Sequence, residues 1–235
     1  MSTDHFQIAV SDIHVDVVKK DIKHLHLAVY PPTGRVRLSS PHSVKTESLR
    51  LFIISKLGWI KKHIRDMNSQ IREPEREYIQ GESHWYQGHR YLLNIIEENS
   101  PPKVSIRNKS YIDLYVRPGS DKSKKEEVIK QWYRDRLKEE IPVMIKKWEN
   151  KLGVTVSAWG VKQMKTKWGS CNIKDRRIWL NLELAKKPKH CLEYVVLHEM
   201  MHFKERHHND RFKELLSKYM PSWKKRREDL NEVVY

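Results

Sequence analysis

The segment that decides the fold is Leu197-His198-Glu199-Met200-Met201-His202-Phe203. Because His198 and His202 are four residues apart, a helix places both imidazoles on one face, one turn apart, where they can bind one metal ion. Glu199 follows the first histidine, so its carboxylate can face a water on that ion and accept a proton. Residues 194–197 (Tyr-Val-Val-Leu) make the helix apolar, and we expect it to be buried. Buried imidazoles and a buried carboxylate need polar partners, which a metal ion supplies.

The pattern H-E-x-x-H is typical of zinc metallopeptidases, in which the metal activates a water that attacks a peptide carbonyl. The chain has 13 histidines among 235 residues, so a chance match has to be weighed against this interpretation. In that alternative, His198 and His202 are a hydrogen-bonded pair in an apolar core. A catalytic zinc ion has three protein ligands and one position open to water. The metal hypothesis therefore predicts a third ligand from elsewhere in the chain.

The third ligand is expected just beyond the helix, where His207 and His208 follow. If the helix continued, residue 208 would lie about 9 Å along the axis from His202, which is too far to share an ion. Asn209 is a good N-cap for a new helix, whose apolar positions are Phe212, Leu215, Leu216 and Tyr219. Such a break lets His208 turn back toward the metal.

Two other residues remain alternatives for this position. His207 is adjacent to His208, and Glu214 lies one turn into the predicted new helix. Asp210 is a candidate for orienting a ligand through a hydrogen bond. With three good ligands and no obvious fourth, the pattern favours a catalytic Zn²⁺ site over a closed structural one.

Composition excludes several classes of protein. No apolar run is long enough to span a membrane, and the N-terminal residues MSTDHFQIAV do not resemble a secretory signal. Cys171 and Cys191 are the only cysteines, too few for a disulfide scaffold, which favours a cytoplasmic location. We therefore expect no membrane contact and a peptide or protein as substrate.

The charge balance keeps a second function open. The chain has 46 Lys and Arg residues and 30 Asp and Glu residues, which gives a formal net charge of +16. Basic residues follow Trp59 and fill Lys224–Arg227, so the surface can attract nucleic acid. The alternative to a zinc peptidase is thus a basic nucleic-acid-associated protein, which includes a DNA-recruited protease, whose metal site is structural or vestigial.

The hydrophobic periodicity predicts an α+β fold. A β-rich N-terminal region, 1–118, contains one helix at about 44–71, and a core domain follows at 119–235. A long helix is expected from an Asp121 N-cap to Gly153, with Pro142 kinking or interrupting it. The strands are expected at 13–17, 25–30 and 36–38 (with a turn at 31–34), within 78–117, and at 154–159, 162–168 and 177–182.

Several motifs in one order resemble the YgjP-like metallopeptidase family. They are Met164–Cys171 (MKTKWGSC), Ile178–Asn181 (IWLN), Tyr194–Glu199 (YVVLHE), and then His208 and Phe212. The resemblance covers residues 120–232 closely and the first part of the chain more loosely. It implies a compact zincin core, in which a small sheet packs against the active-site helix.

The same resemblance implies specific roles. His198, His202 and His208 correspond to zinc ligands, and Glu199 to the general base. The chain departs from the family pattern in two places, with Met200 where the family has Leu, and His207 where it has Asn before the ligand.

The segment before the metal helix is expected to bind substrate. We expect Lys165–Cys171 to be a strand at the rim of the cleft, where a free edge can pair with an extended peptide. Gly169 would allow close backbone approach, and Lys167, Trp168 and Ser170 complete the candidate substrate-binding residues. Trp168 is alternatively a core residue, and Cys171 is expected to be a small packing residue.

The group that stabilises the oxyanion is not evident from the pattern. Tyr194 lies on the metal helix but is expected to face away from the metal. Lys165, Lys167 and Tyr219 are the remaining candidates.

Overall fold

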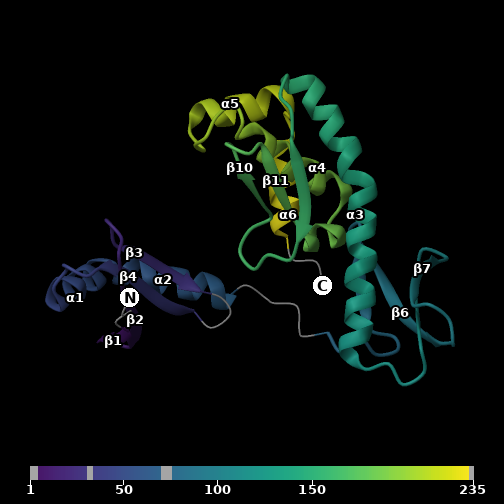
Figure 1. Ribbon diagram of the computed structural model, residues 1–235, viewed down its shortest axis with the longest axis horizontal. Coiled ribbons are helices and arrows are strands. Elements are labelled where there is room, and N and C mark those ends of the chain that lie inside the picture. Colours follow the sequence, from purple (N-terminus) through teal and green to yellow (C-terminus); the bar gives the residue numbers. More distant parts are fainter. Residues whose placement is uncertain (1–4, 31–33, 70–75, 233–235) are drawn as a thin grey trace. The chain divides into compact units, whose positions relative to one another are not determined.

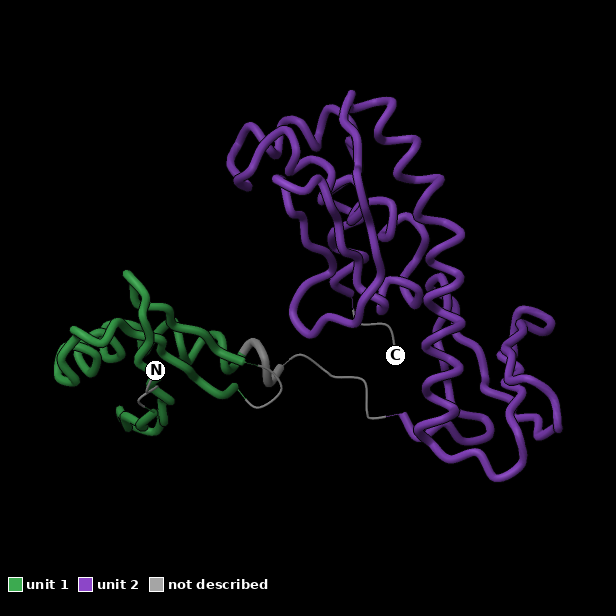
Figure 2. The backbone as a smooth tube through the Cα atoms, in the orientation of Figure 1, with its two compact units in different colours: residues 1–72 green, residues 73–235 purple. Residues whose placement is uncertain are grey.

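The protein has an α+β fold that divides into two compact units (Figures 1 and 2). The structure, a computed structural model, describes residues 5–30, 34–69 and 76–232. The units are Met1–Arg72 and Glu73–Tyr235. This division differs from the predicted boundary after residue 118, because strands 83–116 share a hydrophobic core with the long helix that follows them.

The first unit is a four-stranded sheet with two helices on it. Its strand order is β1-β2-β4-β3, with β2 parallel to β4 and the other neighbours antiparallel. Alternation of apolar residues buries one face of β2, as Ile13, Val15 and Val17 show. The predicted hairpin is confirmed for β3 and β4, while residues 31–33 of its turn lie outside the described residues. The strands are β1 (His5–Val10), β2 (Ile13–Lys20), β3 (His26–Tyr30) and β4 (Arg35–Pro41).

The single helix predicted for residues 44–71 is two helices, α1 (Thr46–Ser55) and α2 (Leu57–Ser69). The break falls at Lys56, whose φ of −105° and ψ of 3° leave the helical region. The apolar spacing does not reveal this break, because buried residues from both helices still reach one core. These residues are Leu49, Ile53 and Ile60.

The second unit contains two further sheets joined by a long helix. One sheet has the order β5-β6-β8-β7 and the other β10-β11-β9. Helix α3 (Lys122–Leu152) contacts both sheets, as Figure 1 shows. The strands are β5 (Ser83–Tyr86), β6 (His89–Glu97), β7 (Lys103–Arg107), β8 (Tyr111–Val116), β9 (Ala158–Lys162), β10 (Gly169–Asn172) and β11 (Arg177–Asn181). The remaining helices are the 3₁₀-helix η1 (Leu182–Lys186), α4 (Lys189–Met201), α5 (Asp210–Tyr219) and α6 (Trp223–Asn231).

Helix α3 has the ends that the sequence predicts. The Asp121 side chain accepts a hydrogen bond from the Lys124 backbone N–H at 2.8 Å, and Gly153 ends the helix with a left-handed φ of 63°. Of the two outcomes predicted for Pro142, a kink or an interruption, the interruption is wrong, because α3 continues through it. Pro142 is on the exposed side, whereas its neighbours Ile141 and Met144 are buried. Water can therefore solvate the carbonyl that proline leaves unpaired, while core packing holds the helix on both sides.

The strand predicted for residues 162–168 is wrong, since only Gly169–Asn172 form β10 and the preceding residues are a loop. The buried Asn181 explains the difference. Its amide nitrogen donates to the carbonyl oxygens of Met164 (3.0 Å) and Lys167 (2.8 Å), and its amide oxygen accepts from the Met164 N–H (3.2 Å). Backbone groups that a strand would have paired are satisfied by this side chain instead.

Composition also predicted no membrane span and no disulfide. Among the described residues, none of the helices combines the length and the apolar character that crossing a bilayer requires. Cys171 and Cys191 are both free. Burial raises the pKa of the Cys171 thiol to about 12 and that of Cys191 to about 11. Both thiols are therefore neutral near pH 7, as packing residues are.

Helix α4 is buried on nearly all sides, and Glu193 is one of the charged residues that hold it in place. The carboxylate of Glu193 accepts hydrogen bonds from Lys147 on α3 and from Arg226 on α6, the latter at 2.6 Å. Burial raises the pKa of Glu193, but the two cationic donors outweigh burial, so this pKa lies below its ordinary value of 4.5. The ionised carboxylate therefore ties α4 to two neighbouring helices.

We expect Glu193→Gln to lower the free energy of unfolding at pH 7 by about 1–3 kcal/mol, because it leaves two cations without their carboxylate. Since the native pKa is lowered, this stabilisation is present above the unfolded pKa and is lost as pH falls through the native one. Denaturant unfolding, followed by tryptophan fluorescence at pH 7 and pH 3, measures both effects. Glu139→Gln, which removes only an exposed pair with Arg136, is the control. A difference from wild type that persists unchanged at pH 3 would contradict the assignment.

Candidate metal centre

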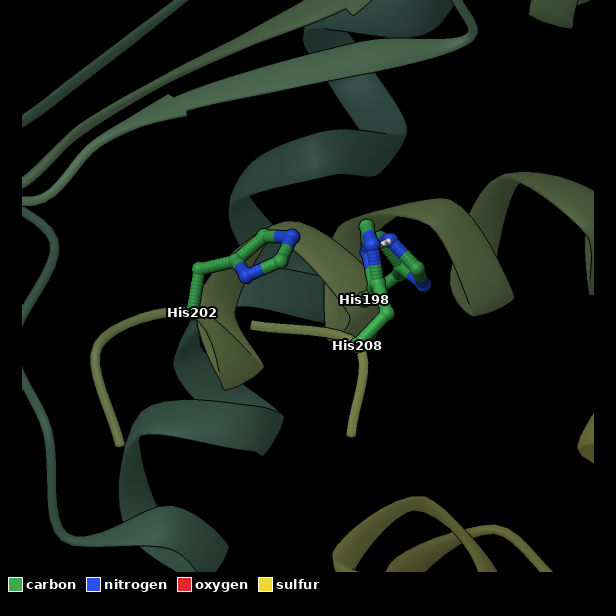
Figure 3. Close-up of side chains that lie close together, drawn as sticks. All are labelled: His198, His202 and His208. Atoms are coloured by element: carbon green, nitrogen blue, oxygen red, sulfur yellow. Dashed lines mark hydrogen bonds between the residues drawn. The ribbon is translucent and has the colours of Figure 1, made fainter. Parts of the chain in front are cut away.

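Three histidines converge where helix α4 ends. His198 comes from α4, His202 is the residue that caps the C-terminus of α4, and His208 comes from the segment that turns back after it (Figure 3). One ring nitrogen from each lies within 4.8 Å of the other two, and the Nε2 atoms of His198 and His208 are 2.9 Å apart. Two imidazole nitrogens at this distance need a shared proton or a cation between them. The structure thus brings the three predicted residues together.

The chain reversal that places His208 has a local cause. After α4, the Lys204 N–H bonds to the Met201 carbonyl at 2.9 Å, which closes a turn. The Asn209 side chain then caps α5 by accepting a hydrogen bond from the Phe212 N–H at 2.9 Å. This is the N-cap that the sequence predicted. The capped start of α5 directs His208 back over the end of α4.

Phe212 supports all three rings from one side. Its ring centroid lies 5.1 Å from that of His198, 5.0 Å from that of His202 and 4.8 Å from that of His208. Only 2% of Phe212 is exposed. The phenyl ring therefore excludes water from one side of the cluster and limits the rotation of the imidazoles.

Hydrogen bonds orient the outward nitrogens of the two helical histidines. The Tyr194 hydroxyl oxygen lies 3.5 Å from Nδ1 of His198, and the Glu205 carbonyl oxygen lies 3.3 Å from Nδ1 of His202. An Nδ1–H that donates outward leaves the other ring nitrogen with its lone pair toward the centre. The expectation that Tyr194 faces away is wrong, since the tyrosine contacts His198 one turn later on the same helix.

The alternatives for the third ligand lie elsewhere. His207 and Glu214 are exposed and outside the cluster. The Asp210 carboxylate pairs with Lys213 at 2.9 Å and is exposed, so it orients no histidine. Cys171 is also outside the cluster. In residues 5–30, 34–69 and 76–232, one group of three or more His, Cys, Asp or Glu side chains lies close enough together to hold one ion. It consists of His198, His202 and His208.

The protonation of the cluster suits a cation. Burial lowers the pKa of His198 to about 3, with further lowering from His202, His208 and Arg227. Burial also lowers the pKa of His202. These imidazoles are therefore neutral at physiological pH, which is the form that binds a metal. Imidazole nitrogens that converge in this way are a donor set that fits zinc.

Glu199 lies directly under strand β10. It is 6% exposed, and burial raises the pKa of its carboxyl to about 8, with Lys167 opposing the shift. A Cβ atom at Gly169 would lie 2.6 Å from Oε1 of Glu199. The group that closely approaches Gly169 is therefore the side chain of Glu199. A positive charge added at the histidines would stabilise the ionised form of this carboxyl.

An open cleft of about 590 Å³ lies over the histidines and Glu199. Its lining includes Lys167, Trp168, Gly169 and Ser170, so the structure brings the predicted substrate-binding residues to the metal centre. Trp168 is half-buried and also packs against the core, which combines its two expected roles. Strand β10 is an edge strand, paired only with β11.

The structure also places residues at the cleft that the sequence did not single out. Arg206 and Arg227 line the cleft, whereas the sequence pattern shows Arg227 only as part of the basic segment Lys224–Arg227. Tyr194 lines it as well, whereas Lys165 and Tyr219, two of the oxyanion candidates, do not. Asn181 holds the loop that leads into β10. The sequence places Asn181 in the IWLN motif, but it does not predict this role. The hydrogen bonds of Asn181 go to a loop that the sequence pattern predicts to be a strand.

We expect Gly169→Ala to lower the free energy of unfolding of the second unit by about 1–3 kcal/mol, because the new methyl group overlaps the Glu199 side chain. Denaturant unfolding followed by tryptophan fluorescence reports on this unit, which contains every tryptophan except Trp59. Gly58→Ala is the matched control, since nothing lies within 4 Å of its added Cβ. Equal stability of Gly169→Ala and wild type would show that Glu199 does not pack against this glycine.

A comparison with known proteins identifies the family of the chain. Residues 23–233 match the family described as YgjP-like, metallopeptidase domain. Among curated proteins, no match is found. Among solved structures, the chain is similar to the metallopeptidase zymogen jannalysin of Methanocaldococcus jannaschii, with 24% identity and a TM-score of 0.35 over 39% of this chain and 93% of that one. The family match extends over nearly the whole chain, the three histidines and Glu199 included. The chain therefore belongs to the YgjP-like metallopeptidase family.

Proposed function

We propose that this metallopeptidase uses zinc and hydrolyses peptide bonds with Glu199 as general base. The observation that carries the proposal is the convergence of three imidazoles beside a buried glutamate at the floor of an open cleft. His198, His202 and His208 would hold the ion. Bound there, zinc would supply Lewis acidity, which lowers the pKa of a water and polarises a carbonyl.

The environment of Glu199 suits proton transfer. Its carboxyl is buried between α4 and β10 and its pKa is raised to about 8, so it holds a proton more readily than an exposed glutamate does. It would accept a proton from the attacking water and deliver it to the amine that leaves. Packing against Gly169 restricts the side chain to the position from which it can do both.

Strand β10 would position the substrate. Its free edge offers backbone N–H and C=O groups beside the cleft, and an extended peptide can pair with them. Residues 167–170 lie where the entering chain would pass, with the Trp168 ring as an apolar wall. The loop before β10 is held by Asn181, which keeps this edge in place.

The number of ligands supports catalysis over a structural site. A structural zinc ion normally has four protein ligands, whereas a catalytic one keeps a position for water. Within the described part of the chain, the cluster has three members, and the cleft opens onto it. This argues against the alternative in which the metal only stabilises a basic, nucleic-acid-associated protein.

We expect Glu199→Gln to bind one zinc per chain and to lose about 100- to 10,000-fold in kcat/KM, because the amide cannot accept the proton. Metal analysis and cleavage of an unstructured protein substrate measure the two properties on the same sample. A chelator-treated wild-type sample is the control for residual activity. Full activity in Glu199→Gln would rule out its role as general base.

His208→Ala tests the third ligand, with His207→Ala as its neighbouring control. We expect His208→Ala to lower zinc affinity by at least about tenfold, since one of three nitrogens is removed. His207→Ala should retain wild-type affinity because this residue is exposed and outside the cluster. Competition with a zinc-binding dye measures both. The opposite ranking would assign the ligand to His207.

A further inference from the structure

The active-site cleft extends beyond the metal centre into a second hollow. This hollow has a volume of about 730 Å³ and shares Cys171, Ile173, His202 and Arg206 with the first, so the two form one continuous groove. It passes between the end of β10 and the turn that follows α4. Lys174 and Lys204 are added to the lining there.

The groove is lined by five basic residues, which we call the cleft cations. They are Lys167, Lys174, Lys204, Arg206 and Arg227. In the part of the chain that the structure describes, the single carboxylate in the lining is Glu199, which belongs to the metal centre. An excess of one charge in a cleft with apolar walls concentrates ligands of the opposite charge.

Within the described ranges, the cleft cations form no ion pairs with carboxylates. Among the described residues, none of the five lies within 4.0 Å of an acidic side chain. Neighbouring basic residues outside the groove are paired, as Arg226 is with Glu193 and Arg177 is with Asp175. An acidic ligand would therefore meet cations that form no ion pair with a carboxylate of the described residues.

We infer that the substrates are acidic polypeptide segments, with Asp or Glu on the residues that lie in the groove next to the bond to be cut. The inference rests on the proposed function and adds the substrate class. A chain paired with β10 would pass Lys167 near one end of the strand and Lys174 just beyond the other. The cations therefore lie where side chains on both sides of the site would extend.

The lining of the groove suits a nucleic acid less well than an acidic peptide, although both ligands are negatively charged. Binding of single strands depends on exposed aromatic faces on which bases stack. Of the aromatic residues in the groove, Tyr194 is 5% exposed, Trp168 has the Lys187 ammonium over its ring at 5.6 Å, and Phe203 has the Arg176 guanidinium over its ring at 5.7 Å. The free strand edge of β10 instead offers peptide hydrogen bonds. These contacts favour an acidic peptide.

The first test measures binding. A labelled ten-residue peptide with four Asp or Glu is compared, by fluorescence anisotropy with the full chain, with the same peptide carrying Asn or Gln instead. We expect the acidic peptide to bind at least about tenfold more tightly at low salt, and salt to reduce the difference. Lys174→Glu/Lys204→Glu should remove this preference. Lys138→Glu/Lys146→Glu, which makes the same charge change on exposed positions of α3, should leave it unchanged.

The second test measures cleavage by the zinc-loaded protein. The ratio of kcat/KM for the acidic and amide peptides should exceed about ten and should fall toward one in Lys174→Glu/Lys204→Glu. Equal binding and equal cleavage of the two peptides would overturn the inference while leaving the peptidase intact. If neither peptide is cut, the proposed function fails, and the binding comparison still decides the charge preference. An oligonucleotide of equal charge that binds more tightly, and loses affinity in the groove variant, would assign the groove to nucleic acid.

Discussion

The reversal of the chain between His202 and Asn209 is the constraint on which the site depends. Two histidines on one helix cannot complete a metal centre, and a third from a continued helix would be too far along the axis. The turn after α4 and the Asn209 cap of α5 bring His208 back within 2.9 Å of His198. Phe212, placed by the same cap, then packs against all three rings. One hydrogen bond at a helix start thus determines both the third nitrogen and the apolar support under the cluster.

Burial accounts for the chemistry of this centre as well as its shape. Desolvation keeps His198 and His202 neutral, which is the form that binds a cation. It also makes Glu199 a weaker acid, and a cation at the histidines would stabilise the ionised carboxylate that acts as a base. The burial is achieved by α4, which is apolar nearly all round and is covered by α3, α5, α6 and β10. Glu193 shows that such a helix still needs polar anchors at its exposed side, where Lys147 and Arg226 hold it. The contrast between a neutral, buried floor and a basic rim gives the groove its proposed preference for acidic chains.

Local patterns predicted much of the fold. Apolar alternation identified β2, β3 and β4 of the first unit but not β1, and the Asp121 and Gly153 signals identified both ends of α3. The errors have physical reasons. The break at Lys56 is invisible to spacing because both helices bury residues in one core. Residues 163–168 have strand-like composition, but the Asn181 side chain satisfies their backbone groups. The unit boundary follows from long-range packing between 83–116 and α3, which no local signal reports.

The sequence by itself determined that two imidazoles and a carboxylate share one turn of an apolar helix, since helix geometry converts spacing into direction. It also determined where the next helix begins, through Asn209. Only the tertiary structure decided that His208 and not His207 or Glu214 faces the other two, because that choice depends on the path of a turn. Contacts between distant segments likewise placed Glu199 against Gly169, brought the Tyr194 hydroxyl to His198, and gathered Lys174, Lys204 and Arg227 along one groove. Such contacts arise when separate elements pack, so spacing along the chain carries no record of them.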